Sequence, residues 1–269
     1  MSNVEDIRKK IPNIAWAYWD SGLIGLPPVL RVCLESWEKN GDFDEIRLLD
    51  DSSVLQFLNA DLLPRKFRSL PAQMKSDAIR LALLRQHGGI WLDMSTLVTA
   101  PVATWAETMS NGVGFFIFQN PRKGRGGRVF EIGFLASEPA FPLVSAWSRL
   151  LNSFFSRRRI HMAHSPSGGA PILARKAFAA INKWTRKTPG RSSLWARLPL
   201  KLLPFYPYFI TYYLGNRLLL PPRSPFSLDS IEYLDSGEYL SVRQSIDKRG
   251  VLSGIEELRV SKVPVHDIE

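Results

Sequence analysis

Hydrophobic residues alternate between strand-like and helix-like spacing through the first half of the chain. The segment "NIAWAYWD" at 13–20 has the aromatic and small residues of a strand, and "PPVLRVCLESWEKN" at 27–40 has apolar residues at helical spacing behind two prolines that can open a helix. A second strand is predicted at 45–49 and a short helix at 53–64. This β-α-β-α order predicts an α/β domain with parallel strands.

The next segment, "KSDAIRLALLRQHGGIWLDMS" at 75–95, predicts a helix, a sharp turn and a strand. Ser69 and Pro71 are suited to the N-cap and first turn of the helix. The helix is expected to stop at Gly88, because a glycine most easily takes the left-handed conformation that closes a helix. The remaining predicted elements are two paired strands and a long amphipathic helix, at 112–119, 126–137 and 140–155.

Polar residues of this helix and strand are spaced so that their side chains can meet. Spacings of three and four residues place Asp77, Arg80 and His87 on one face of the helix. The opposite face carries the core residues Ile79, Ala82 and Leu83. Side chains alternate along a strand, so a common face is predicted for Trp91, Asp93 and Ser95. Asp93 ends a central strand, where open α/β sheets bind their ligands.

Two interpretations fit these residues. In one, a salt-bridged surface helix is followed by a core strand. In the other, the residues handle a diphosphate: a carboxylate binds Mg²⁺ or Mn²⁺, hard cations that bridge to phosphate oxygens, and Arg80 braces the carboxylate or a donor group with its planar fork. The second aspartate then accepts hydrogen bonds from ribose or sugar hydroxyls.

Charge is distributed unevenly along the chain. The net charge is +10, and no Asp or Glu occurs between Pro139 and Leu228, whereas residues 157–223 carry 13 Lys and Arg. Such a block attracts polyanions, anionic lipid headgroups or phosphorylated small molecules. Nucleic acid is not the expected partner, because no zinc-finger spacing, ribonucleoprotein signature or homeodomain-like helix accompanies the charge.

Aromatic residues mix with basic ones at 192–222, and the uncharged run at 202–215 is too short to span a bilayer, which needs about 20 residues. This mixture suits a membrane interface, but a buried aromatic subdomain with basic edges fits equally well. Cys33 is the single cysteine, which excludes an intramolecular disulfide and fits a reducing compartment. No apolar signal region precedes the first proline, so a cytoplasmic location is expected, with peripheral contact to the inner face of the cell membrane.

The stretch "SDAIRLALLRQHGGIWLD" at 76–93 resembles the Ser-Asp-x-x-Arg … Gly-Gly-x-aromatic-x-Asp signature of glycosyltransferases with a DXD motif. Three further motifs fit the same family in the same order: "IPNIAWAYWDSG" at 11–22, "ESW" at 35–37 and "LLDD" at 48–51. The chain is similar to the capsular polysaccharide synthesis branch, which is related to glycosyltransferase family 32 and to the large clostridial glucosylating toxins. The resemblance covers residues 11–147.

The resemblance implies a GT-A fold, in which helices flank a Rossmann-like nucleotide-sugar-binding sheet. It also implies a nucleotide-sugar donor such as a UDP-sugar, a divalent cation (Mn²⁺ or Mg²⁺) and anomeric retention. By matching positions, the expected catalytic residues are Asp77, Arg80 and Asp93. Donor binding is expected from these three and from Trp16, Trp19, Ser76, Gly88, Gly89, Trp91 and Ser95, with one of the first two tryptophans beside the base.

The metal ligands that we expect are Asp93, Ser95 and His266. Asp93 matches the first Asp of the DXD motif, whereas Ser95 replaces the second and offers a single neutral oxygen. A serine does not bind a metal ion as a bidentate ligand, and an Asp-x-Ser variant is familiar in the capsular branch.

Plainer roles compete for several of these residues. Trp16 and Trp19 also suit the core, the Asp50–Asp51 pair also suits a helix cap, and His87 suits a helix end. Further candidates for metal or phosphate contacts are His161, His164 and the glycine turn "HSPSGGAP" at 164–171.

We therefore predict a GT-A-like nucleotide-sugar-binding core at 1–156 and a basic, aromatic, mainly helical extension at 157–269, packed on the core and contacting the acceptor or the membrane surface. The predicted function is transfer of a sugar from a nucleotide-diphosphate donor to a bacterial surface glycan or lipid-linked precursor, as in capsule or lipopolysaccharide synthesis. The alternative is an inactive nucleotide-sugar- or polyanion-binding protein that keeps the fold.

Overall fold

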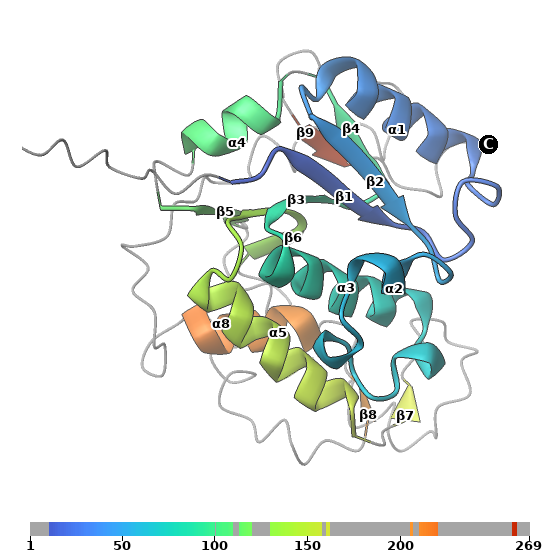
Figure 1. The fold of residues 1–269 in the computed structure, drawn as a ribbon, viewed down its shortest axis with the longest axis vertical. Coiled ribbons are helices and arrows are strands. Elements are labelled where there is room, and N and C mark those ends of the chain that lie inside the picture. Colours follow the sequence, from blue (N-terminus) through green and yellow to red (C-terminus); the bar gives the residue numbers. More distant parts are fainter. Residues whose placement is uncertain are drawn as a thin grey trace, which may run out of the picture.

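A five-stranded sheet forms the centre of the computed structural model, which describes residues 11–99, 101–109, 113–119, 130–157, 160–161, 205–206, 210–219 and 260–262 (Figure 1). Its strands are β1 (Ile14–Tyr18), β2 (Glu45–Leu49), β3 (Gly89–Leu92), β5 (Phe115–Gln119) and β6 (Phe130–Ser137). The strand order is β2-β1-β3-β6-β5; β1 pairs in parallel with β2 and β3, and β6 and β5 continue the sheet as antiparallel neighbours. The predicted α/β class is confirmed, including the paired strands of the later segment.

Helices cover both faces of the sheet (Figure 1). One face packs against α1 (Pro28–Asn40) and α4 (Ala103–Met109). The other packs against α2 (Val54–Phe57), α3 (Ala72–Gln86), α5 (Pro142–Phe155) and α8 (Ile210–Leu219). Side chains alternate along the strands, so the two faces carry different residues. Ala15 and Ile90 pack in the core cluster on the α1 and α4 side, whereas Trp16 and Trp91 pack in the cluster on the side of α2, α3, α5 and α8. The result is a three-layer α/β/α arrangement.

Short elements connect and border these layers. The first prolines open α1 as predicted, since Pro27 is its N-cap and Pro28 its first residue. The helix predicted at 53–64 is instead divided, because Leu58 has an extended backbone between α2 and a 3₁₀ turn. The remaining short elements are η1 (Ala60–Leu62), η2 (Phe67–Ser69), β4 (Thr96–Val98), β7 (Ile160–His161), β8 (Phe205–Tyr206) and β9 (Val260–Lys262).

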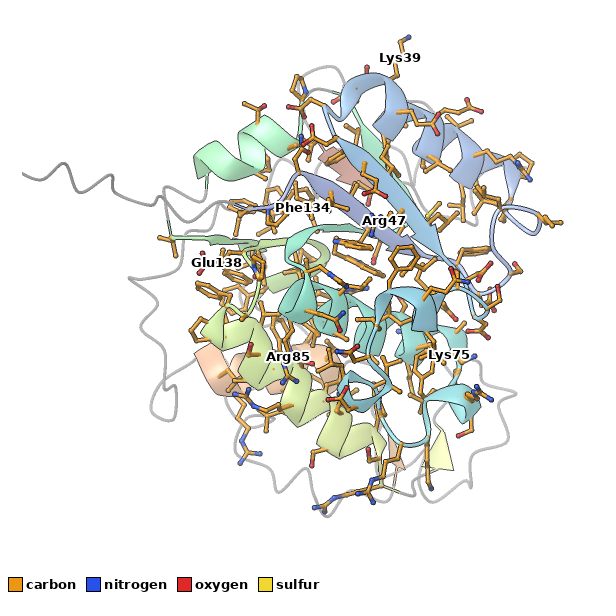
Figure 2. All side chains as sticks on the ribbon, viewed as in Figure 1. Lys39, Arg47, Lys75, Arg85, Phe134 and Glu138 are labelled. Atoms are coloured by element: carbon orange, nitrogen blue, oxygen red, sulfur yellow. The ribbon has the colours of Figure 1, made fainter. Side chains whose placement is uncertain are left out.

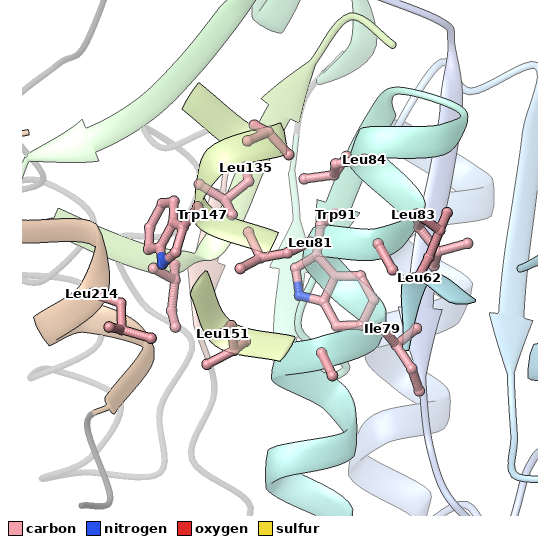
Figure 3. Packing of buried hydrophobic residues seen from close by; sticks show 14 of the residues in the cluster. Leu62, Ile79, Leu81, Leu83, Leu84, Trp91, Leu135, Trp147, Leu151 and Leu214 are labelled. Carbon is pink, nitrogen blue, oxygen red and sulfur yellow. The ribbon is translucent and has the colours of Figure 1, made fainter. Parts of the chain in front are cut away.

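Helix α3 is buried on nearly every side, which corrects the interpretation of a surface helix. Figure 3 shows its residues Ile79, Leu81, Leu83 and Leu84 packed in the cluster that also holds Trp91. The charged residues of α3 are covered as well, because α5 and β3 pack on it from different directions. The helix begins at Ala72 with Pro71 as N-cap, and Ser69 does not cap it, because its hydroxyl donates to the Lys66 carbonyl in the preceding turn.

Two glycines make the connection from α3 to β3. Gly88 has φ +68° and Gly89 has φ +96°, the left-handed region that favours glycine. A Cβ on Gly88 would lie 2.7 Å from the Ser137 carbonyl oxygen, and one on Gly89 would lie 2.7 Å from the Ile14 carbonyl oxygen. The pair therefore ends the helix as predicted and lets β3 enter the sheet directly between β1 and β6.

Elements from beyond residue 157 contact the first half of the chain. Helix α8 contributes Ile210, Tyr213, Leu214 and Leu218 to the core cluster of α3 and α5. Strand β9 pairs with β4 in antiparallel register, and its last residue, Lys262, lies opposite Thr96. Most of the predicted basic extension, including its aromatic stretch apart from these elements, lies outside the described residues.

Candidate active site

Arg80 lies between two carboxylates at the carboxyl end of β3. Its Nη2 donates to Asp93 Oδ1 at 2.7 Å, and its Nη1 lies 3.4 Å from Asp77 Oδ1, one turn earlier on α3. The guanidinium carbon lies 5.0 Å from the centroid of the Trp91 ring. Arg80 is 4% exposed and Asp77 is 6% exposed. The cation thus lies between two anions and an aromatic face, and the hydrogen bond from its Nη2 holds the Asp93 carboxylate in place.

Asp93 directly follows the last residue of β3. Its main-chain N–H donates to the Gly133 carbonyl at 2.8 Å, which continues the pairing with β6. Its Oδ1 also accepts a hydrogen bond from Trp91 Nε1 at 3.0 Å. The Asp93 side chain is nevertheless 21% exposed. A carboxylate with a fixed orientation that still reaches solvent is suited to binding a substrate or a metal ion.

Residues 93–95 form a turn instead of continuing the strand. The Thr96 N–H donates to the Asp93 carbonyl at 2.9 Å, so the chain changes direction before β4 begins. Trp91 and Asp93 do lie on one side, since the indole N–H reaches the carboxylate. The predicted alternation as far as Ser95 is wrong, because the turn moves this buried residue out of the strand register.

Asp77 connects this group to the C-terminal part of the chain. Its Oδ2 accepts a hydrogen bond of 2.7 Å from the Thr211 hydroxyl at the start of α8, 134 residues away. Sequence reasoning missed Thr211, because no local pattern marks a single threonine in a segment that matches no motif. Asp77, Arg80 and Asp93 were expected together, and the structure brings them together.

The tryptophans expected near the donor base occupy different environments. Trp16 is fully buried, its Nε1 donates to the Gly88 carbonyl at 2.9 Å, and its ring lies 5.4 Å from the ring of His87. The structure therefore places Trp16 in the core, where it supports the α3–β3 turn. Trp19 is half-buried at the carboxyl end of β1, and its Nε1 donates to the Gly25 carbonyl at 3.2 Å.

Helix α3 and the turn that follows it hold the other residues that were expected to bind the donor. Ser76 is half-buried next to Asp77 on α3. Gly88 and Gly89 are required by the turn itself. His87 is the C-cap of α3, as its position at the predicted helix end indicated, and its Nε2 lies 2.6 Å from the Phe57 carbonyl oxygen.

A second polar cluster lies beside the first, at the carboxyl ends of β1 and β2. Asp51 accepts hydrogen bonds from Tyr18 Oη and Lys75 Nζ, each at 2.5 Å. Burial, followed by the hydrogen bond to Asp51, raises the pKa of Tyr18 above its ordinary range. Lys75 comes from the start of α3 (Figure 2), so this cluster ties two strand ends to the helix of Arg80. Neither Tyr18 nor Lys75 was predicted.

Asp50, the neighbour of Asp51, has a structural role in the turn before α2. Its Oδ1 accepts hydrogen bonds from the main-chain N–H and the hydroxyl of Ser52 and of Ser53. These hydrogen bonds favour the charged form and lower the pKa of Asp50 to about 2. Asp50 therefore holds the turn before α2 and is not its cap, because the N-cap is Ser53, which makes no side-chain capping hydrogen bond. Asp51 pairs with Lys75 instead.

The expected metal ligands are only partly within the described residues. Asp93 and Ser95 stand two residues apart in one turn, and the described part of the chain has no group of three or more His, Cys, Asp or Glu side chains placed to hold a metal ion. His266 and His164 lie outside the described residues, and so does the side chain of His161. Among the described helices, none combines the length and the apolar character that a membrane span needs.

Known proteins are similar to this chain in the segment that carries the site. The model of a family described as capsular polysaccharide synthesis protein matches residues 2–164. O-glycosyltransferase braB of Annulohypoxylon truncatum is 24% identical over 159 residues, which are 52% of this chain and 37% of that protein. The initiation-specific alpha-1,6-mannosyltransferase of Saccharomyces cerevisiae is 28% identical over 109 residues, 37% of this chain and 23% of that protein.

The matched segments therefore span well under half the length of these two curated relatives. A solved structure, that of PaToxG glycosyltransferase, aligns with a TM-score of 0.40 and 14% identity over 82% of each chain.

Proposed function

Because this chain belongs to the capsular polysaccharide synthesis protein family, we propose that it transfers a sugar from a nucleotide-diphosphate donor to a glycan or a lipid-linked acceptor. The family was expected from the sequence motifs, and that expectation is confirmed. The relatives that match the segment are named glycosyltransferases. The bacterial surface glycan that we expected as the product remains part of this proposal, since the two named relatives are fungal.

The observation that carries the proposal is the environment of Asp93. Its carboxylate follows the central strand, is held by Arg80 and Trp91, and is still reached by solvent. Open α/β sheets bind ligands at this edge. A carboxylate held in this way keeps its orientation while a donor enters and leaves, which suits repeated turnover better than a purely structural ion pair.

A divalent cation fits this site if the donor supplies part of its coordination. Mg²⁺ binds through one or two carboxylates together with substrate phosphates, and the turn offers the Asp93 carboxylate and the Ser95 hydroxyl. When bound, Mn²⁺ or Mg²⁺ neutralises charge on the leaving diphosphate. His266 is proposed as a further ligand. The described strand β9 ends opposite Thr96, one residue after Ser95.

The residues around Asp93 have distinct proposed roles. Arg80 holds Asp93 in position beside Asp77. Trp91 is fully buried, so it orients the Asp93 carboxylate from within the core and does not line the donor pocket as expected. Trp19, half-buried at the end of β1, is the tryptophan available to a nucleotide base, since Trp16 is enclosed in the core. A UDP-sugar donor and retention of the anomeric configuration are proposed from the family resemblance.

The basic segment at 157–223 supports a proposed contact with an anionic membrane surface, where lipid-linked acceptors reside. Its 13 Lys and Arg without any acidic residue suit such a surface. The protein is expected to sediment with vesicles that contain anionic lipid and to dissociate as salt is raised. Equal recovery in the soluble fraction with neutral and anionic vesicles at low salt contradicts this contact.

Donor turnover separates the enzyme from an inactive binding protein that keeps the fold. The protein is incubated with a panel of sugar nucleotides and Mn²⁺, and release of the nucleotide diphosphate is measured beside the melting temperature. An enzyme releases the diphosphate from one donor, whereas a binding protein is stabilised by that donor without releasing it. If no donor is hydrolysed, the proposed function is wrong, and if none raises the melting temperature either, the binding alternative is wrong as well.

A further inference from the structure

The second residue of helix α8, Thr211, reaches the candidate active site. Thr211 is 1% exposed, and its hydroxyl donates to Asp77 Oδ2 at 2.7 Å in a buried environment. Thr211 lies beyond the family-matched segment, which ends at residue 164. Burial of a carboxylate oxygen costs free energy unless a donor reaches it, so the Thr211 hydroxyl stabilises the buried Asp77 carboxylate.

The start of α8 is itself fixed against the core. Trp147 Nε1 on α5 donates to the Thr211 carbonyl at 2.9 Å. A Cβ on Gly215 would lie 2.4 Å from the Trp147 ring, so this helix packs closely on α5. Figure 3 shows Trp147 of α5 and Leu214 of α8 facing one another in the same cluster. The hydroxyl of Thr211 is therefore presented to Asp77 from a rigid position.

A continuous series of contacts leads from this hydroxyl to the exposed carboxylate. Thr211 holds Asp77 Oδ2, Asp77 Oδ1 lies 3.4 Å from Arg80 Nη1, and Arg80 Nη2 donates to Asp93 Oδ1 at 2.7 Å. We propose that Thr211 is a positioning residue for sugar transfer, which acts through Asp77 and Arg80 on the orientation of Asp93. This inference rests on the proposed function for its activity readout, and on the contacts alone for its structural readout.

The hydrogen bond to Oδ2 accompanies an orientation of Asp77 in which Oδ1 faces Arg80. Its removal is expected to change that orientation and, through the position of Arg80, the orientation of Asp93. Partners that orient the ligands of a site in this way typically change affinity or activity roughly 10- to 100-fold when they are removed. Thr211→Val keeps the volume and removes only the hydroxyl, whereas Thr211→Ser keeps the hydroxyl.

The first measurement is turnover of the donor by the full chain. Thr211→Val is expected to lower kcat roughly 10- to 100-fold, with a smaller change in KM, and Thr211→Ser is expected to restore most of the loss. The matched control is Thr99→Val, because the Thr99 hydroxyl is buried without a hydrogen-bond partner among the described residues. That control is expected to leave kcat unchanged.

The second measurement does not depend on activity. In a sample with ¹⁵N-labelled tryptophan, the indole N–H of Trp91 reports Asp93, and that of Trp147 reports the docking of α8. Replacement of each tryptophan by Phe assigns its signal among the eight. Thr211→Val is expected to shift the Trp91 signal and to leave Trp147 in place.

Each outcome decides the proposal. An unchanged Trp91 signal overturns it, whatever happens to kcat. A shift of both signals, with no rescue by serine, shows that Thr211 only packs α8, which also overturns it. If the wild-type protein hydrolyses no donor, the proposed function fails, and the Trp91 signal alone still decides whether Thr211 positions Asp93.

Discussion

Arg80 and Asp93 lie 13 residues apart in the sequence and form a 2.7 Å ion pair across the Gly88–Gly89 turn. Arg80 is buried, whereas the side chain of Asp93 is partly exposed. Arg80 therefore supports Asp93, and Asp93 is the partner that a ligand can reach. The predictions below separate these two roles.

Asp93→Asn is expected to lower turnover at least about 100-fold, because a metal-binding anion contributes several kcal/mol to the transition state. The amide oxygen of Asn can still accept from Arg80 and Trp91, so the melting temperature is expected to change little. Donor hydrolysis and thermal melting are measured together. Asp61→Asn, on an exposed turn, controls for the lost charge. Activity within a few-fold of wild type with metal present contradicts the role of Asp93.

Arg80→Lys is expected to lower turnover roughly tenfold or more, since a hydrogen bond to a charged group contributes about 1.5–3 kcal/mol. A lysine keeps the charge, but a single ammonium does not reproduce a guanidinium whose Nη2 donates to Asp93 while its Nη1 lies beside Asp77. The comparison is Arg85→Lys, a half-buried position on the same helix. Equal turnover of the two variants shows that charge alone is sufficient and that the fork has no role.

Gly89→Ala is expected to destabilise the fold, since a non-glycine residue at φ +96° costs about 1–3 kcal/mol. Its Cβ also approaches the Ile14 carbonyl and the Trp16 indole, so the pairing of β1 with β3 is strained. Urea unfolding measures the loss. Gly25→Ala is the control, because its Cβ meets only the side chain and carbonyl of Ser21 in an exposed loop. A loss no greater than that of the control contradicts the account of the turn.

Asp50 is expected to make stability depend on pH in a narrow acidic range. Its pKa is lowered in the folded state from 3.8 to about 2, so its contribution is fully present above about pH 4 and is lost as the pH falls through 2. Wild type is therefore expected to be more stable than Asp50→Asn at pH 6, and the difference is expected to disappear near pH 2. Urea unfolding at several pH values measures this; a difference that is constant with pH excludes the lowered pKa.

The order of elements could be predicted because hydrophobic spacing is a local property. Apolar periodicity, the prolines before α1 and the Gly-Gly break after α3 each depend on a few neighbouring residues. The same locality explains why the ends of β3 and α2 were predicted less well. The turn at 93–95 is closed by its own main-chain hydrogen bond, and side-chain alternation does not reveal such a turn.

The sequence by itself therefore determined the α/β class from the order of its elements and the family from four motifs in order. It also determined the grouping of Asp77, Arg80 and Asp93, which follows from spacing along one helix, one turn and one strand. Only the tertiary structure decided that α3 is buried, that Trp16 belongs to the core, and that Asp51 binds Tyr18 and Lys75. It also decided that Thr211 holds Asp77 from 134 residues away. Burial and long-range hydrogen bonds depend on which layers pack together, and that packing leaves no periodic signal in the chain.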